Sequence, residues 1–166
     1  MSTPIVTCAT FSVARRNKPT YFREMPDRRY RIVIFDDNEL LGITLWREFH
    51  ATGYEAYYLR SKVNGLDWIK QYHPDLIISD IESPELDGFE FLRILKSDPA
   101  ASQIPFIFLT SRASLESAIE AKNMGAADFV SKPYDPTDLQ EVVRRVLQEH
   151  SGHDLHASTS GKMPMY

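Results

Sequence analysis

The chain has 166 residues, 43% of them hydrophobic and 25% charged, a composition that suits one globular domain with ends to spare. It is too apolar for a disordered chain, and its uncharged apolar runs are far too short to span a membrane. The formal net charge of −4 does not favour a broad electrostatic grip on nucleic acid, and the single cysteine, Cys8, excludes an internal disulfide. We therefore expect a cytoplasmic protein that binds neither nucleic acid nor membrane by itself.

Composition divides the chain into three segments. Residues 1–29 are rich in basic groups and lack a sustained hydrophobic period, which predicts a mostly disordered N-terminal extension. An organelle transit peptide is the alternative for this segment, although no clean amphipathic helix is visible in it. Residues 30–150 form the predicted domain, and residues 151–166 are polar and small, which predicts a flexible C-terminal tail.

Within the predicted domain, short apolar runs alternate with segments of helical period. The apolar runs predict strands at 31–35, 54–59, 75–80, 105–110 and 128–131. The segments between and after them predict helices at 39–52, 63–72, 89–97, 114–124 and 135–150. Strict alternation of five strands and five helices implies βαβ units, and therefore a parallel sheet that is covered on both faces.

Polar side chains follow four of the predicted strands at the point where each strand ends. The first strand is followed by Asp36 and Asp37, and the third ends in Asp80. The fourth ends in Thr110, and Lys132 directly follows the fifth. Because the carboxyl ends of parallel strands meet at one edge of a sheet, we expect three acids, a hydroxyl and a lysine to converge there.

Three carboxylates that lie close together repel one another unless some are protonated or a cation lies among them. Oxygen ligands alone suit a hard ion such as Mg²⁺, which shares its ligands with a phosphate. A lysine and a hydroxyl beside them supply donors for phosphoryl oxygens. This set of groups indicates phosphoryl transfer, in which a carboxylate can itself attack phosphorus and become an acyl phosphate.

Four stretches resemble the receiver (CheY-like) domains of two-component response regulators, in the stand-alone, single-domain type. They are IVIFDDNELL, PDLIISDIESPELDGFEFL, PFIFLTSRA and ADFVSKPYDPTDL. The resemblance covers roughly residues 31–148 and implies an α/β fold. That fold is flavodoxin-like and doubly wound, (βα)5, with a five-stranded parallel sheet in the order 2-1-3-4-5.

The resemblance also implies roles for the acidic residues. Asp80 is the expected phosphorylated aspartate. Asp37 is the expected direct ligand of Mg²⁺, Asp36 is expected to assist through water, and Glu82 is expected to supply its backbone carbonyl to the metal.

Further roles follow from the same resemblance. Thr110 and Lys132 are expected to bind phosphoryl oxygens, with Thr110 and Phe129 forming the conformational switch. The bond before Pro133 is often cis in this family. The usual partner surface corresponds to about residues 114–150.

We therefore expect a single-domain response regulator that a histidine kinase or a histidine phosphotransfer protein phosphorylates. It would catalyse only its own phosphorylation and dephosphorylation, so it is not expected to be an enzyme in the usual sense. The flanking segments are too short for a DNA-binding or enzymatic output domain. Output would then come from a protein target, from onward phosphotransfer, or from pairing of two phosphorylated copies.

Two other functions stay open at this point. One is a Mg²⁺-dependent phosphohydrolase of similar topology with Asp80 as nucleophile. Haloacid-dehalogenase enzymes carry Asp-x-Asp after the first strand, and Asp36-Asp37-Asn38 matches that pattern poorly. The other is a pseudo-receiver that binds partners without phosphorylation.

Single residues also admit plainer interpretations. Asp80 could only cap a helix, Lys132 could be a solvated surface residue, and Phe129 could be static core. The recurrence of His150, His153 and His156 would make a metal ladder on a helix, but Gly152 and the polar tail argue against a helix there.

The mouth of the site departs from the commonest receiver pattern. Ser83 and Ser111 stand where an apolar and a small residue are usual. The resemblance implies that Glu82 and Arg112 lie at the mouth of the site, and their opposite charges predict an ion pair that gates the entrance to Asp80 and slows hydrolysis of its acyl phosphate. The plainer interpretation is two solvated side chains that make no contact.

Overall fold

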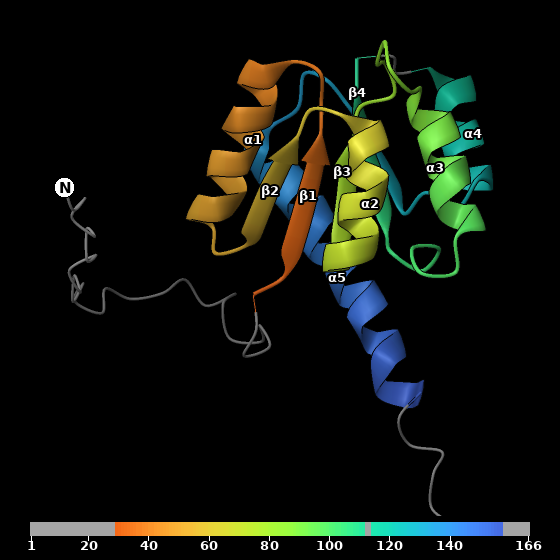
Figure 1. Cartoon of the computed structure of the whole chain (residues 1–166). Coiled ribbons are helices and arrows are strands. Elements are labelled where there is room, and N and C mark those ends of the chain that lie inside the picture. Colours follow the sequence, from red (N-terminus) through yellow and green to blue (C-terminus); the bar gives the residue numbers. More distant parts are fainter. Residues whose placement is uncertain (1–28, 112–113, 158–166) are drawn as a thin grey trace, which may run out of the picture.

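The computed structural model describes residues 29–111 and 114–157. In it, five strands alternate with five helices, as the sequence predicts (Figure 1). The expected extension over residues 1–28 and the final residues of the expected tail lie outside the described residues. The strands are β1 (Arg31–Phe35), β2 (Glu55–Leu59), β3 (Leu76–Ser79), β4 (Phe106–Thr110) and β5 (Asp128–Ser131). The helices are α1 (Glu39–Ala51), α2 (Lys62–Tyr72), α3 (Gly88–Ser97), α4 (Leu115–Asn123) and α5 (Pro136–Ala157).

The five strands form one parallel sheet in the order β2-β1-β3-β4-β5, which confirms the predicted doubly wound fold. The register pairs Ile32 with Leu76 and Phe35 with Ser79, so β1 and β3 end beside each other. The strand order reverses between these two strands. Open parallel sheets bind their ligands at the carboxyl edge next to such a reversal. A functional site is therefore expected at the ends of β1 and β3.

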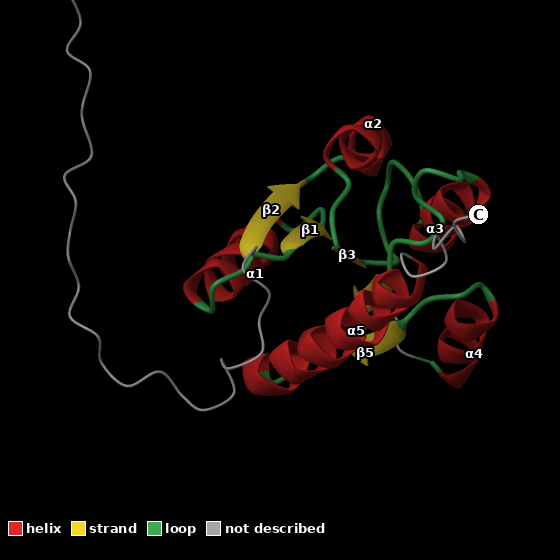
Figure 2. Cartoon of the chain, turned by 90° about the horizontal axis from the view of Figure 1, so that it is seen from below, coloured by secondary structure: helices red, strands yellow, loops and turns green. Residues whose placement is uncertain are grey.

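Alternate side chains of the strands enter two separate cores. Ile32 and Ile34 pack with residues of α1 and α5, whereas Val33 and Phe35 pack with residues of α2, α3 and α4. Figure 2 shows α1 and α5 on one side of the sheet and α2 and α3 on the other. Because the side chains of a strand alternate with a period of two, a strand buried on both faces is apolar at every position.

Polar caps set the points at which the first four helices begin. Asn38 caps α1, Ser61 caps α2, Asp87 caps α3 and Ser114 caps α4, each accepting a hydrogen bond from a backbone amide of the first turn. Because Ser61 is the cap, α2 begins at Lys62, one residue before the predicted start.

Helix α5 is longer than predicted. The sequence predicts an end at His150, but the helix continues through Gly152 to Ala157. A single glycine costs a helix only about 1 kcal/mol, and the hydroxyl of Tyr30 lies 2.8 Å from the Ser151 hydroxyl on the last part of the helix. The domain boundary at residue 150 stays a prediction. Of the three histidines at this end of the helix, His150 has its ring 2.8 Å from the Val146 carbonyl. The side chains of His153 and His156 lie outside the described residues.

Among the helices of the described residues, none has both the length and the apolar character needed to span a bilayer.

Candidate functional site

Polar side chains that follow three strands meet at the carboxyl edge of the sheet, beside the reversal of strand order, and the end of a fourth strand adjoins them through its backbone. Asp36 and Asp37 follow β1, Asp80 follows β3, and Lys132 follows β5. The backbone amide of Lys132 donates to the carbonyl of Thr110, the last residue of β4, at 2.8 Å. The convergence that the strand ends predict is therefore present in the fold.

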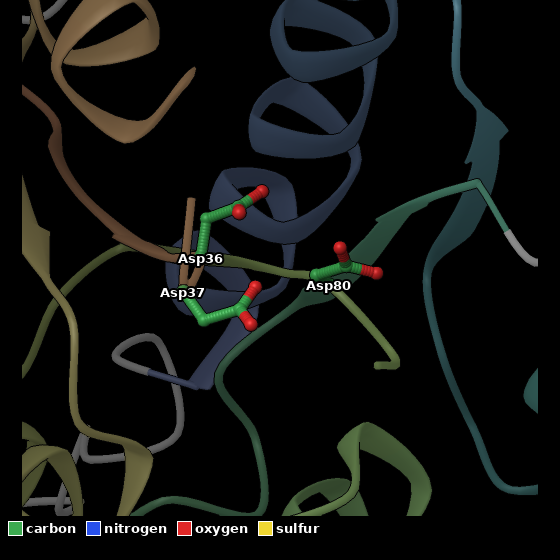
Figure 3. Close-up of side chains that lie close together, drawn as sticks. All are labelled: Asp36, Asp37 and Asp80. Atoms are coloured by element: carbon green, nitrogen blue, oxygen red, sulfur yellow. The ribbon is translucent and has the colours of Figure 1, made fainter. Parts of the chain in front are cut away.

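The carboxylates of Asp36, Asp37 and Asp80 form one cluster (Figure 3). Each offers an oxygen, and these oxygens all lie within 4.8 Å of one another. Asp36 is 3% exposed and Asp80 is 6% exposed, whereas Asp37 faces solvent. Three negative charges at this separation, two of them buried, require positive charge nearby.

Lys132 supplies part of that positive charge. Its Nζ lies 2.7 Å from Oδ2 of Asp36 and 2.9 Å from Oδ2 of Asp80, and its side chain is 15% exposed. Burial alone would lower the pKa of this ammonium, but the hydrogen bonds and charges of the two carboxylates outweigh burial and raise it. Lys132 is thus part of the acidic cluster, and its interpretation as a solvated surface residue is wrong.

Backbone groups fix the two buried carboxylates from the other side. The amide of Asn38 donates to Oδ1 of Asp36 at 2.9 Å, and the amide of Glu82 donates to Oδ1 of Asp80 at 3.2 Å. The cap of α3 is Asp87, whose side chain accepts from the Phe89 amide. Asp80 therefore does not cap the helix that follows it, and its carboxylate points into the cluster instead.

The loop after Asp80 is closed at its base by Gly88. The amide of Gly88 donates to the carbonyl of Ile81 at 2.8 Å. A Cβ atom on residue 88 would lie 2.7 Å from both the carbonyl oxygen of Asp80 and Cα of Ile81. Only glycine permits this approach, so the start of α3 is held against the end of β3.

The expected switch residues lie on the two neighbouring strands β4 and β5. Thr110 is fully buried, and it pairs in register with Ser131, one residue before Lys132. Phe129 on β5 is half-buried, and its ring centroid lies 6.3 Å from that of Phe108. Partial burial is compatible with both static packing and movement, so the switch role of Phe129 stays a prediction.

At the mouth of the site, the described residues show one side-chain contact of Glu82. Glu82 is exposed, and its Oε2 accepts a hydrogen bond from the Ser111 hydroxyl at 3.3 Å. Arg112 lies outside the described residues, so the expected pairing with Glu82 stays a prediction. Ser111 thus provides a contact across the entrance, between the ends of β3 and β4.

Mg²⁺ fits this set of groups. The cluster consists of carboxylate oxygens, the ligand type that the ion prefers, and exposed Asp37 leaves room for water or a phosphate oxygen. The Lys132–Pro133 peptide bond is cis, as the resemblance implies.

Two supporting residues were not predicted as part of the site. Tyr58 on β2 donates its hydroxyl hydrogen to the carbonyl of Asp36 at 3.0 Å. Lys62 at the start of α2 is 2% exposed and donates to the carbonyl of Leu86 at 3.2 Å. Neither has a sequence signal, since a tyrosine in a strand and a lysine opening a helix are ordinary at a surface.

The response regulator receiver domain is the family whose model matches this chain, over residues 32–144. The chain is 34% identical over 117 residues to the polar-differentiation response regulator DivK of Brucella ovis, which covers 70% of this chain and 94% of DivK. It is 35% identical over 121 residues to the regulatory protein AtoC of Escherichia coli, covering 73% of this chain and 26% of AtoC. The chain also covers 53% of "Probable transcriptional regulator ycf29" of Pyropia yezoensis, at 31% identity.

The chain therefore spans about half or less of the length of the latter two relatives, and nearly all of DivK. Solved structures agree with this assignment. A CheY-like response regulator receiver domain protein from Methanospirillum hungatei superposes with a TM-score of 0.71 at 28% identity, covering 76% of this chain and 99% of the other. Chemotaxis response regulator CheY4 of Vibrio cholerae gives a TM-score of 0.67 at 26% identity, covering 72% and 99%. The fold, the acidic edge and the match over residues 32–144 place this chain in the family of receiver domains of two-component response regulators.

Proposed function

We propose that this chain is a single-domain response regulator whose Asp80 is phosphorylated by a histidine kinase or a histidine phosphotransfer protein in the cytoplasm. The observation that carries the proposal is the position of the Asp80 carboxylate, which lies among Asp36, Asp37 and Lys132 at the edge where strand order reverses. A carboxylate in that position combines a nucleophile with neighbouring groups that can neutralise an incoming phosphoryl group.

The residues of the acidic cluster would hold Mg²⁺. Asp37 and Asp80 would supply carboxylate oxygens, Asp36 would act through water, and Glu82 would supply its backbone carbonyl. When bound, the ion neutralises charge on the phosphoryl oxygens.

The reacting atom of this chain is a carboxylate oxygen of Asp80. It forms a bond to phosphorus while the bond between phosphorus and the donor's imidazole nitrogen breaks, and the product is an acyl phosphate. The ammonium of Lys132, which donates hydrogen bonds to Asp36 and Asp80 in this structure, can donate to a phosphoryl oxygen. Asp36 and Asp80, held by backbone amides, and the partly buried Lys132 need little rearrangement for this role, and such positioning favours catalysis.

The signal would leave through the surface formed by residues 114–150. A phosphoryl group on Asp80 would draw Thr110 inward and let Phe129 fill the vacated space, which biases α4, β5 and α5 between two packings. Leu115 and Ile119 on α4 are 74% and 51% exposed, so this surface already presents apolar side chains that a protein target or a second copy could cover.

Labelling with acetyl phosphate tests the proposal. The wild-type protein should take up one phosphoryl group per chain in the presence of Mg²⁺, and Asp80→Asn should take up none. Asp87→Asn is the matched control, because asparagine still caps α3 and the change lies in the same loop.

The outcome also separates the competing functions. Release of many phosphate equivalents from a phosphomonoester would indicate a phosphohydrolase, and labelling that does not depend on Asp80 would contradict the assignment. A wild-type chain that stays unlabelled, yet binds a partner equally well, would indicate a pseudo-receiver.

A further inference from the structure

A second lysine lies close to the acidic cluster and has no part in the function proposed above. Lys62, the first residue of α2, is 2% exposed, although lysine is almost never fully buried unless it is paired. Its Nζ donates to the carbonyl of Leu86 at 3.2 Å. Leu86 belongs to the loop between Asp80 and Gly88, so the lysine reaches from α2 to the loop that carries the reacting aspartate.

The neighbouring residue makes a parallel connection. The hydroxyl of Ser61, the cap of α2, donates to Oε1 of Glu85 at 2.9 Å. The cap and the first residue of α2 thus contact two consecutive residues of the loop. Because α2 begins at the carboxyl edge of the sheet (Figure 1), this connection joins the start of α2 to the loop that follows Asp80.

Acidic side chains of the site offset part of the cost of burying this ammonium. Burial lowers the pKa of Lys62, and four carboxylates oppose that shift by attraction, Asp80 most strongly, followed by Asp87, Asp37 and Asp36. The three members of the acidic cluster are all among them. Lys62 therefore experiences the field of the cluster, and by reciprocity it contributes a positive potential there.

We propose that Lys62 is a positioning residue of the phosphorylation site, whose buried ammonium holds the loop after Asp80 against α2 and weakens the binding of Mg²⁺ to the acidic cluster. This inference rests on the proposed function, because it assigns Mg²⁺ to that cluster. A fixed cation near three carboxylates repels a second cation, so the site holds Mg²⁺ less tightly than its three acids alone would.

Calorimetric titration of the full chain with Mg²⁺ tests the charge directly. Lys62→Met removes the charge and the donor, and Lys62→Gln removes the charge but keeps an N–H donor for Leu86. Both variants should bind Mg²⁺ roughly three- to tenfold more tightly than the wild type. Lys62→Arg keeps the charge and should bind Mg²⁺ with nearly the wild-type dissociation constant.

Lys96 provides a matched control. It is half-buried, and like Lys62 it donates from Nζ to a backbone carbonyl, that of Ser102, at 2.8 Å. Burial lowers its pKa, and no carboxylate of the cluster acts on it. Lys96→Met should therefore lose a similar hydrogen bond and leave the affinity for Mg²⁺ unchanged.

Hydrogen exchange tests the connection to the loop. Amides of residues 82–88 should exchange faster in Lys62→Met than in the wild type, with a smaller change in Lys62→Gln. Exchange rates equal to those of the wild type in Lys62→Met would overturn the positioning role.

The inference and the proposed function fail in different ways. If the wild type binds Mg²⁺ and takes label on Asp80, but both neutral variants titrate like the wild type or more weakly, the electrostatic role of Lys62 is wrong and the function stands. If the wild type binds no Mg²⁺, both are overturned. Should Lys62→Met not fold, Lys62→Gln alone decides the question.

Discussion

Tyr58 on β2 donates its hydroxyl hydrogen to the backbone carbonyl of Asp36, 3.0 Å away, just beyond the end of the neighbouring strand β1. The ring that makes this bond lies over Gly42 of α1, where a Cβ atom would be 2.1 Å from Cε2 of the tyrosine. The backbone of the first acidic residue is therefore supported by a helix that contains none of the site's own carboxylates.

The first prediction concerns this contact. Gly42→Ala should lower the free energy of unfolding by about 1–3 kcal/mol, because the methyl group must displace the Tyr58 ring. Helix propensity alone would favour alanine by about 1 kcal/mol. A loss of stability in Gly42→Ala would therefore indicate crowding by the Tyr58 ring, and a gain would indicate that helix propensity dominates. Urea denaturation measures the effect, and the penalty should shrink in a Tyr58→Ala background. An equal penalty in both backgrounds would mean that the ring is not the cause.

Removal of Asp36 and removal of Asp37 should affect the protein differently. Asp37 is exposed, so Asp37→Ala should change the free energy of unfolding of the metal-free protein by no more than about 0.5 kcal/mol. It should abolish Mg²⁺-dependent labelling and the rise in melting temperature that Mg²⁺ produces. Asp36 is buried and bonded to Lys132, so Asp36→Ala should cost about 1–3 kcal/mol and only weaken labelling. An unchanged shift with Mg²⁺ in Asp37→Ala would contradict the metal assignment.

Removal of Lys132 should separate phosphorylation from its structural effect. Lys132→Ala leaves Asp36 and Asp80 without their shared ammonium, so the metal-free protein should lose roughly 3 kcal/mol of stability. Label should still be acquired slowly, but the change in hydrogen exchange over residues 114–150 should disappear. A phosphorylated variant that shows the wild-type exchange pattern would exclude this role for Lys132.

The lifetime of the acyl phosphate tests the mouth of the site. Arg112→Ala should hydrolyse faster than the wild type if a Glu82–Arg112 pair obstructs the attacking water. Ser111→Ala removes the observed donor to Glu82 and should also change the rate, by a few-fold. The effects of Glu82→Ala and Ser111→Ala should not add, because the two side chains share one contact. Additive effects would mean that this contact has no bearing on hydrolysis.

Alkaline pH should reveal the burial of Tyr134. Burial, followed by the charges of Glu48 and Asp36, raises the pKa of this phenol from 10.0 to about 12. Since the unfolded chain loses the proton at lower pH, the unfolded state is favoured progressively as pH rises from 10 to 12. Tyr134→Phe should therefore lose less stability than the wild type over that range, as measured by urea denaturation at pH 9 and pH 11. Equal losses of stability in the two proteins would contradict a raised pKa of the Tyr134 phenol.

Features that follow from hydrophobic period or from position at a strand end could be predicted from the sequence. Carboxyl ends of parallel strands share one edge, so Asp80 and Lys132 could be brought together from their positions alone. Tyr58 and Lys62 could not be placed, because their roles depend on which helix passes over which strand. The extension of α5 was missed because a glycine and polar residues lower helix propensity without forbidding a helix. The contact between Ser111 and Glu82 depends on the paths of two loops, for which no periodic pattern exists.

The closure of the loop at Gly88 has a consequence for how this protein can vary. With the base fixed by the Gly88–Ile81 hydrogen bond and Glu85 held by Ser61, Pro84 is exposed at the tip of the loop. A different side chain at residue 84 would leave the Asp80 carboxylate where it is, whereas a side chain at residue 88 would push α3 away from the sheet. Recognition by different partners could thus diversify at the tip without altering the chemistry a few residues away.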